Sequence, residues 1–193
     1  MDIETRDDLI SAVKDYSLRS DAPVDLFLQL FETDLKTLVT HYFAETIVDL
    51  PIVGGKVSLP ADFLKARDVR ADNFKTRQLG IRDTFVDVDE VGYRQVGKQY
   101  VFVGRTDIQN VQIVYTAKVP ALTAANPTNW LLDSFPNVYL HGVLAKLYRW
   151  AKDDVAEGLE KQSLAEALAV VAEDDRQGRN PAAPNTFGGA AAW

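Results

Sequence analysis

The sequence predicts an α+β protein, with helices towards both ends of the chain and short strands in the middle. Near both ends, apolar residues recur every three or four positions, the period of a helix with one buried face. Between about residues 44 and 120 the period shortens to two, as in half-buried strands. From Arg179 onward neither period continues, and the composition turns to Pro, Gly, Ala and Asn.

The first helix is expected to begin after Thr5 and to end near Ser20. Thr5 can cap its free amides, and acidic residues at 7 and 8 suit its first turn. A second helix is expected from Ser20 or Asp21, with Pro23 in its first turn. Short-linked helices of this kind pack antiparallel. The apolar stripe expected on the second helix comprises Leu26, Phe27, Leu30, Phe31, Leu35 and Leu38.

The middle of the chain predicts a small antiparallel sheet or sandwich. Residues 45–50 and 56–59 are expected to pair as a hairpin across the turn Gly54-Gly55. A turn is expected at 59–63, a strand at 66–70 and a short helix at 83–91. Residues 100–103 and 111–117 alternate as half-buried strands do.

The segment 126–142 connects this β-rich middle of the chain to two expected C-terminal helices, which we call the closing helices. Asp133 or Ser134 is expected to cap a helix that Pro136 opens, because proline suits the first helical position. Trp130, Leu131, Leu132 and Phe135 are expected to form a buried plug against it. The closing helices are expected at about 136–152 and 154–177, the second burying Leu159, Leu164, Ala167, Leu168 and Val171.

Residues 179–193 form a predicted extended tail that docks to a partner. The tail has too little apolar bulk to fold alone, but large aromatic side chains on a Pro, Gly and Ala string are what partner grooves capture. The expected partner-binding residues are Arg179, Asn180, Pro181, Pro184, Phe187 and Trp193.

Composition excludes several classes of function. The 193 residues carry 21 Lys and Arg against 28 Asp and Glu, a net charge of −7, which disfavours phosphate wrapping and hence nucleic-acid recognition. Without cysteine there is no disulfide, thiolate metal site or cysteine nucleophile. Neither a secretion signal nor a membrane span is expected.

No enzyme, metal or cofactor signature is found. His41 and Glu45 could share a helix face, but zinc needs three or four ligands. His141 is expected to be a satisfied core or rim residue. The sequence from Asp87 to Lys98 fails the calcium-loop rule at positions five and twelve, and Gly54-Gly55 lacks the Lys and Ser or Thr of a phosphate loop.

Three motifs, in order and spacing, resemble the head-tail adaptor (connector) proteins of tailed bacteriophages. They are Gly55-Lys-Val-Ser-Leu-Pro-Ala-Asp-Phe-Leu64, then Ile113 to Leu122 followed by Asn126-Pro-Thr-Asn-Trp-Leu-Leu132, and Pro136-Asn-Val-Tyr-Leu-His-Gly142. The chain departs from the family at His141, where its members often carry Tyr. The resemblance covers most of residues 5–178.

This resemblance implies an antiparallel helical bundle of two N-terminal and two C-terminal helices, with a small antiparallel β domain inserted between them. Residues 1–178 would be one adaptor domain, with helices at about 5–40 and 136–177 and the β insert at about 44–120. It also implies a dodecameric ring in the virion neck, with the tail in the portal above, a tail or nozzle protein below, and a channel for DNA. The alternatives are another neck or tail-completion ring and a small acidic metal-dependent enzyme.

Overall fold

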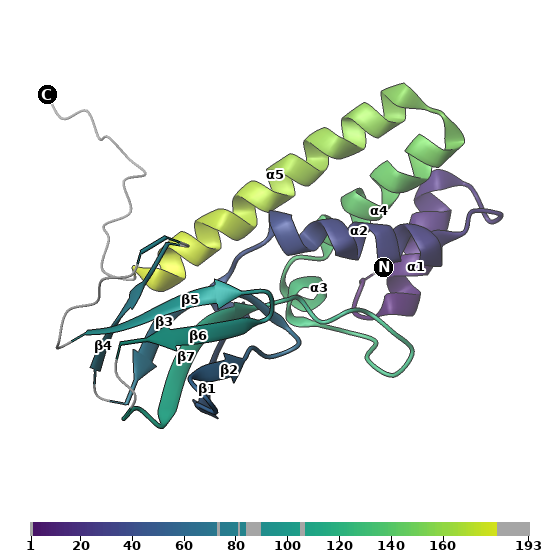
Figure 1. The fold of residues 1–193 in the computed structure, drawn as a ribbon. Helices are drawn as coiled ribbons and strands as arrows, with labels where there is room; N and C mark the ends of the chain where they lie inside the picture. Colours follow the sequence, from purple (N-terminus) through teal and green to yellow (C-terminus); the bar gives the residue numbers. More distant parts are fainter. Residues whose placement is uncertain (1, 73, 81, 84–89, 105–106, 181–193) are drawn as a thin grey trace, which may run out of the picture. The chain divides into compact units, whose positions relative to one another are not determined.

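The computed structural model describes residues 2–72, 74–80, 82–83, 90–104 and 107–180 (Figure 1). The chain divides into two compact units, one made of Met1–Phe43 with Val119–Trp193 and the other of Ala44–Lys118. The first unit is helical and the second is built on a sheet, which confirms the predicted α+β class. The helices are α1 (Arg6–Ser17), α2 (Val24–Leu38), α3 (Trp130–Ser134), α4 (Pro136–Ala151) and α5 (Asp154–Arg179).

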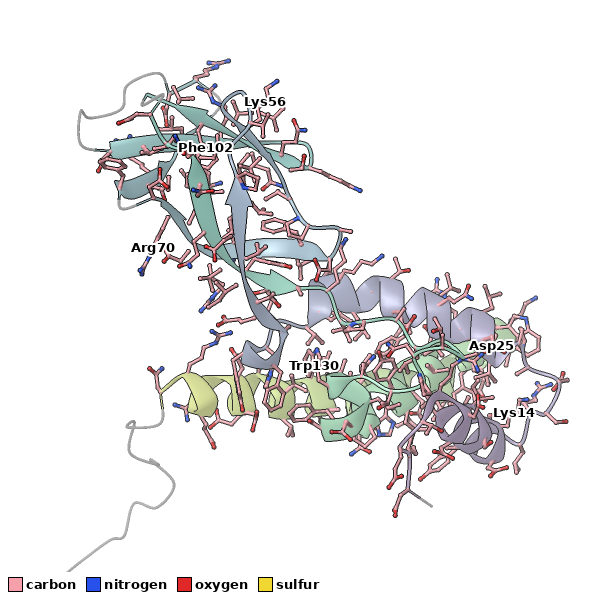
Figure 2. The ribbon with its side chains drawn as sticks, turned by 90° about the horizontal axis from the view of Figure 1, so that it is seen from below. Lys14, Asp25, Lys56, Arg70, Phe102 and Trp130 are labelled. Atoms are coloured by element: carbon pink, nitrogen blue, oxygen red, sulfur yellow. The ribbon has the colours of Figure 1, made fainter. Side chains whose placement is uncertain are left out.

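The cap predicted for α1 is confirmed, whereas the start of α2 is corrected. Thr5 and Asp8 form a reciprocal capping box, in which the Asp8 carboxylate accepts from the Thr5 amide at 2.9 Å. α1 ends at Ser17 because Leu18 takes the left-handed conformation, with φ of +54°. α2 begins at Val24 rather than Ser20 or Asp21, since Pro23 is its N-cap residue and lies outside the first turn. Asp25 of α2, labelled in Figure 2, pairs with Arg6 of α1.

The apolar stripe predicted for α2 is too wide. Phe27, Phe31 and Leu35 are buried as expected. Leu26 and Leu30 are 51% and 48% exposed, because they lie on the side of the helix opposite the core.

At the joint before α4, the helix-capping residue is one that we did not predict from the sequence. The Asn129 side-chain oxygen accepts from the amides of Leu131 and Leu132, at 3.1 and 2.9 Å, and so caps α3. Asp133 and Ser134 do not cap α4, whose N-cap is Phe135 without a side-chain bond. Pro136 does open α4 as predicted.

The core of the helical unit includes a close contact between α2 and α4. Tyr139 and Phe31 are fully buried and meet edge to face, with ring centroids 5.9 Å apart. Gly142 lets the Phe31 ring lie directly on the α4 backbone, since a Cβ there would stand 2.2 Å from two ring carbons. Leu131 and Leu132 are buried in this core as expected, whereas Trp130 and Phe135 are only partly buried, so the buried plug is corrected at both aromatic residues.

α5 is longer and more exposed than predicted. Asp153 caps it by accepting from the Ala156 amide at 3.0 Å. Val171 is buried as expected, but Leu159 is 62% exposed. No described helix combines the length and the apolar composition that a bilayer span requires.

The described strands of the second unit form one seven-stranded sheet in the order β1-β7-β3-β4-β5-β6-β2. They are β1 (Glu45–Pro51), β2 (Lys56–Ser58), β3 (Phe63–Ala71), β4 (Phe74–Gln78), β5 (Glu90–Val96), β6 (Gln99–Val103) and β7 (Asn110–Ala117). β3 begins at Phe63, inside the stretch predicted as a turn, and β4 was not predicted.

The predicted hairpin is wrong, although its turn is present. Gly54 and Gly55 both have positive φ, and a single bridge joins Val53 to Lys56. The two strands then diverge, β1 pairing with β7 and β2 with β6, so they form opposite edges of the sheet. Six strand spacings in a flat sheet span about 29 Å, more than the roughly 18 Å that the connection 52–55 can reach, so the sheet must curl.

The sheet is mixed rather than antiparallel throughout, because β4 and β5 pair in parallel from Lys75↔Glu90 to Gln78↔Tyr93. The helix predicted at 83–91 is wrong at its end, since Glu90 and Val91 begin β5. Residues 84–89 lie outside the described part. The core of this unit is formed by alternate residues of the strands and includes Val69, Tyr93, Tyr100, Phe102, Ile113 and Tyr115.

The two helical glycines at 142 and 158 predict opposite effects of the same substitution. Gly142→Ala should lower the free energy of unfolding by about 1–3 kcal/mol, because the new methyl group overlaps the Phe31 ring. Gly158→Ala in α5 meets no atom within 4 Å and should raise it by about 0.5–1 kcal/mol through helix propensity. Urea unfolding of both variants measures the difference, and a Gly142→Ala protein as stable as Gly158→Ala would contradict the close approach.

Candidate functional site

The segment predicted to dock to a partner begins where α5 ends. Arg179 is the last residue of α5, so it belongs to the helix rather than to the tail. Asn180 is the C-cap residue, and its amide donates to the Arg176 carbonyl at 3.2 Å. Pro181, Pro184, Phe187 and Trp193 lie outside the described residues. The described site is therefore the root of this segment.

The root packs against aromatic residues from two distant parts of the chain. We call His41, Tyr42, Phe43, Trp130 and Phe135 the aromatic clasp. The His41 ring is fully buried and stacks on Trp130, with centroids 5.2 Å apart and planes at 22°. The clasp thus joins the segment before β1 to the joint before α4.

Two hydrogen bonds define the role of His41. Its Nδ1 accepts from the Phe43 amide at 3.2 Å, so the ring hydrogen is assigned to Nε2. Nε2 then donates to the Asp174 carboxylate of α5 at 3.0 Å. Both nitrogens are used, which makes His41 a buried connector between the clasp and α5. It is not on a helix shared with Glu45, which lies in β1 and pairs with Arg67 at 3.1 Å.

Tyr42 closes over the last turn of α5. Its amide donates to Asp175 at 2.7 Å, and its ring covers Gly178, where a Cβ would stand 2.3 Å from a ring carbon. Burial and the nearby Asp174 carboxylate, 3.4 Å from the hydroxyl, raise the pKa of Tyr42 above its ordinary value. Only glycine at 178 lets the ring lie this close to the helix.

Asp175 ties the clasp to Arg179. Burial alone raises the pKa of this carboxyl, but hydrogen bonds from Arg179 and the Tyr42 amide, together with the charge of Arg179, outweigh it and hold the pKa below its ordinary value. The Arg179 Nε lies 2.9 and 2.8 Å from the two carboxylate oxygens. The folded state therefore favours the ionised carboxylate.

These residues bind one another and hold the end of α5. In the part of the chain that the structure describes, no group of three or more His, Cys, Asp or Glu side chains could hold a metal ion. His141 is partly buried, with Nδ1 2.8 Å from the Glu160 carboxylate, as predicted for a satisfied rim residue.

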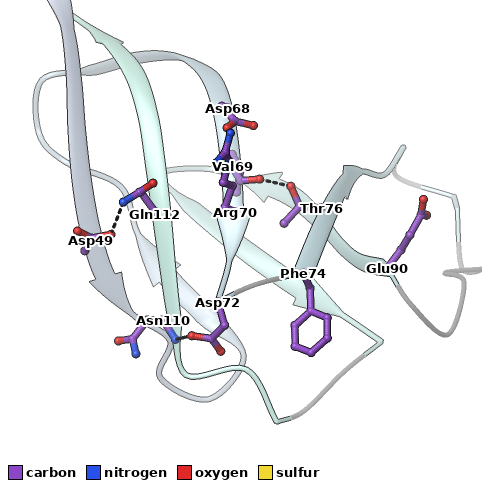
Figure 3. Close-up of a pocket in the computed structure, with 10 residues that line it drawn as sticks. All are labelled: Asp49, Asp68, Val69, Arg70, Asp72, Phe74, Thr76, Glu90, Asn110 and Gln112. Carbon is purple, nitrogen blue, oxygen red and sulfur yellow. Dashed lines mark hydrogen bonds and ion pairs between the residues drawn. The ribbon is translucent and has the colours of Figure 1, made fainter.

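A hollow of about 750 Å³ lies on the β unit and is lined mainly by polar side chains (Figure 3). Figure 3 shows that several of its polar groups bind one another: Asp49 accepts from the Gln112 amide group at 3.1 Å, and Asp72 accepts from the Asn110 amide at 3.3 Å. Asp68 pairs with Arg70 at 2.7 Å. Asp49 and Asp72 thus join neighbouring parts of the sheet, and Asp68 binds a residue of its own strand.

Sequence reasoning missed most of the site. It assigned no role to Asp174 and Asp175, whereas in the structure Asp174 binds His41 and Asp175 binds the Tyr42 amide. A glycine in the last turn of a long helix was the one local signal, because such a position is costly unless a close contact requires it. The partner residues lie 133 positions earlier, and no local pattern indicates that pairing.

The chain matches the family described as SU10 adaptor protein over residues 4–186. No curated protein matches it. The matched residues include the whole β unit, most of the helical unit and the whole clasp.

The lowered pKa of Asp175 predicts that the anchor weakens in acid. A carboxyl whose folded pKa lies below its unfolded value of about 3.9 stabilises the fold above that pH, and the stabilisation is lost as the pH falls through the folded pKa. Asp175→Asn should therefore destabilise the protein at pH 7 and do so much less near pH 3. Urea unfolding at both pH values measures this.

Tyr42→Phe is the matched control, since it keeps the ring over Gly178 and the amide that binds Asp175. It should unfold nearly as the unmodified protein does at pH 7. An Asp175→Asn penalty of the same size at both pH values would show that the ionised carboxylate is not what holds the root.

Proposed function

Because the chain belongs to the SU10 adaptor protein family of phage head-tail adaptors, we propose that it forms the adaptor ring beneath the portal. This ring binds the portal vertex and joins it to the tail or nozzle protein, leaving a central channel for DNA. The ring is dodecameric, as the adaptor resemblance implies. The protein is a structural component of the virion, made in the host cytoplasm, and it needs no cofactor.

The observation that carries the docking proposal is the anchored root of the C-terminal segment. A docking peptide holds its protein in a defined position on the partner only if the point where it leaves the fold is fixed. If that point could move, the peptide would leave the fold in many directions. Here His41, Tyr42 and Arg179 fix the last turn of α5 through Asp174 and Asp175. Beyond this turn, Phe187 and Trp193 are the anchors that the portal captures.

The presence of two compact units supports different roles for the helical and the β part of each ring subunit. We assign residues 1–178 to one adaptor domain, a helical bundle that carries the β segment of about 44–120 as an insert. The bundle presents the docking segment to the portal. The β insert has no part in portal docking and is free to meet the component below.

The acidic charge supports passage of DNA rather than its retention. A channel lined by carboxylates repels phosphates and lets the duplex slide. With a net charge of −7, each copy brings an excess of carboxylates to the ring. The channel therefore makes no sequence-specific contact with DNA.

Removal of residues 181–193 tests the docking proposal. The shortened chain should melt at the same temperature as the full chain, because the described contacts of α5 end at Asn180. It should no longer bind capsids of the same phage that carry the portal but lack the adaptor. Co-sedimentation with such capsids measures binding, and undiminished binding of the shortened chain would refute the proposal.

Single substitutions locate the anchors within the segment. Phe187→Ala or Trp193→Ala should each weaken capsid binding by about 2 kcal/mol, near thirtyfold, if these rings fill portal pockets. Ala190→Ser, between the two aromatic residues, is the matched control and should change binding little. Equal losses in all three variants would argue against aromatic anchoring.

A further inference from the structure

A groove of about 910 Å³ lies in the helical unit, between the residues that precede α1, α1 itself and the start of α4. Its lining is partly apolar and includes Ile3 and Leu140. Tyr16 of α1 also lines it and is 66% exposed. Apolar side chains of this kind gain from being covered, because they are then removed from water. We call this hollow the N-terminal groove.

The remaining lining of the N-terminal groove is acidic. Its carboxylates are those of Asp2, Glu4, Asp15 and Asp133. None of the four forms an ion pair within the part of the chain that the structure describes. Arg6 is already paired with Asp7 and Asp25. Lys14 lies on the side of α1 opposite Ala12, which lines the groove. The groove therefore fits a surface that is both apolar and basic.

The β2 edge of the β unit carries such a surface. Lys56, labelled in Figure 2, is bridged to Val53 and paired with Val101 of β6. Val96 of β5 is paired with Gln99, two positions before Val101. Residues that are paired across strands, or that lie two apart on one strand, project from the same face. Val53 and Val96 are 73% and 57% exposed on this face.

This surface has no carboxylate of its own. We call Val53, Lys56, Val96, Lys98 and Val101 the sheet end. The stretches that supply it, 51–61 and 91–104, contain Lys and Arg but no Asp or Glu. Lys56 and Lys98 are exposed and form no ion pair with any residue that the structure describes. The sheet end is therefore apolar and basic, as the groove requires.

The two units of the chain differ in charge in the same sense. The helical unit has 18 Asp and Glu against 10 Lys and Arg, whereas the β unit has 10 against 11. Copies that each carry a net charge of −7 repel one another, so opposite charges at their contact favour assembly. Each copy brings one acidic groove and one basic sheet end, which makes a second copy the occupant that the charges favour.

We propose that the sheet end of one copy packs into the N-terminal groove of a second copy of this chain. The valines of the sheet end cover the apolar lining of the groove, and the long lysine side chains reach its carboxylates. Because the two surfaces differ, the contact is heterologous and repeats from copy to copy until a ring closes. This contact deepens the ring proposed above and rests on that proposal for closure. The rest of the β unit stays available to the component below.

Engineered cysteines test the contact without background, because the chain has no cysteine of its own. Tyr16→Cys and Val96→Cys are prepared separately in the full chain, mixed, and treated with a short bismaleimide, which joins two thiols. Both side chains are more than half exposed, so their replacement leaves the core intact. The mixture should give a linked dimer, and each variant alone should give none, since the contact joins unlike surfaces.

Two further chains control this experiment. Val170→Cys, exposed on the C-terminal part of α5, replaces Tyr16→Cys in the matched control and should give no dimer with Val96→Cys. A chain that carries both Tyr16→Cys and Val96→Cys should give a ladder of linked copies. Linkage within single chains instead would show that the groove takes the sheet end of its own copy, which would overturn the proposal.

Charge reversal tests the role of the lysines. Lys56→Glu or Lys98→Glu, each made in the sheet-end cysteine chain, should lower the dimer yield roughly threefold. Lys65→Glu is the matched control, because Lys65 is exposed on β3 outside the sheet end and the change in net charge is the same. It should leave the yield nearly unchanged. Equal losses from all three variants would show that net charge alone sets the yield and would overturn the proposal.

Capsid co-sedimentation separates this contact from the adaptor role. The cross-linking is run on the free mixture and on the mixture bound to portal-bearing capsids. If the full chain binds these capsids but neither sample gives more dimer than the Val170→Cys control, the contact is wrong and the adaptor role stands. If the free mixture links but the full chain does not bind capsids, the contact stands and the adaptor role fails. If the chain neither links nor binds, both fail.

Discussion

The helical unit depends on one buried carboxamide, that of Asn129. Its oxygen accepts from the Leu131 and Leu132 amides, and its nitrogen donates to the Pro120 carbonyl at 2.6 Å and to the Tyr139 hydroxyl at 2.8 Å. An amide side chain can make two bonds at each end, so this one is fully used. A single residue thereby caps α3, holds the chain that returns from the β unit, and fixes the largest fully buried side chain of α4. Loss of any partner would leave a buried polar group unpaired, which costs more than the bond itself contributes.

The fixed joint has a consequence at the far end of the last helix. Asn129 positions Trp130, Trp130 stacks on His41, and His41 binds Asp174 near the end of α5. Three stretches that are remote in the sequence thus meet where the C-terminal segment begins. Because each contact uses a group that is buried or already hydrogen-bonded, the last turn of α5 has one arrangement rather than several.

Helix caps, helix starts and turns were predictable wherever residues close in the sequence determine the backbone conformation. The capping box at Thr5, the opening of α4 at Pro136 and the turn at Gly54-Gly55 all follow from backbone constraints of the residues themselves. The errors lie where distant contacts decide. Strands β1 and β2 looked like a hairpin because their turn is correct, yet their partners are β7 and β6. Leu30 and Leu159 looked buried because they fit a helical period, yet they are 48% and 62% exposed.

The sequence by itself determined the α+β class, the nature of most helices and strands, and the family resemblance, because periodicity, caps and motif order are local properties of the chain. Only the tertiary structure decided the strand order, the parallel pairing of β4 with β5, the role of Asn129 and the aromatic clasp. His41 shows the reason. Its neighbour Glu45 suggested a shared helix face, but the group that binds it, Asp174, lies 133 residues away. A partner at that separation is chosen by packing and burial of the whole unit, and no short stretch of sequence carries that information.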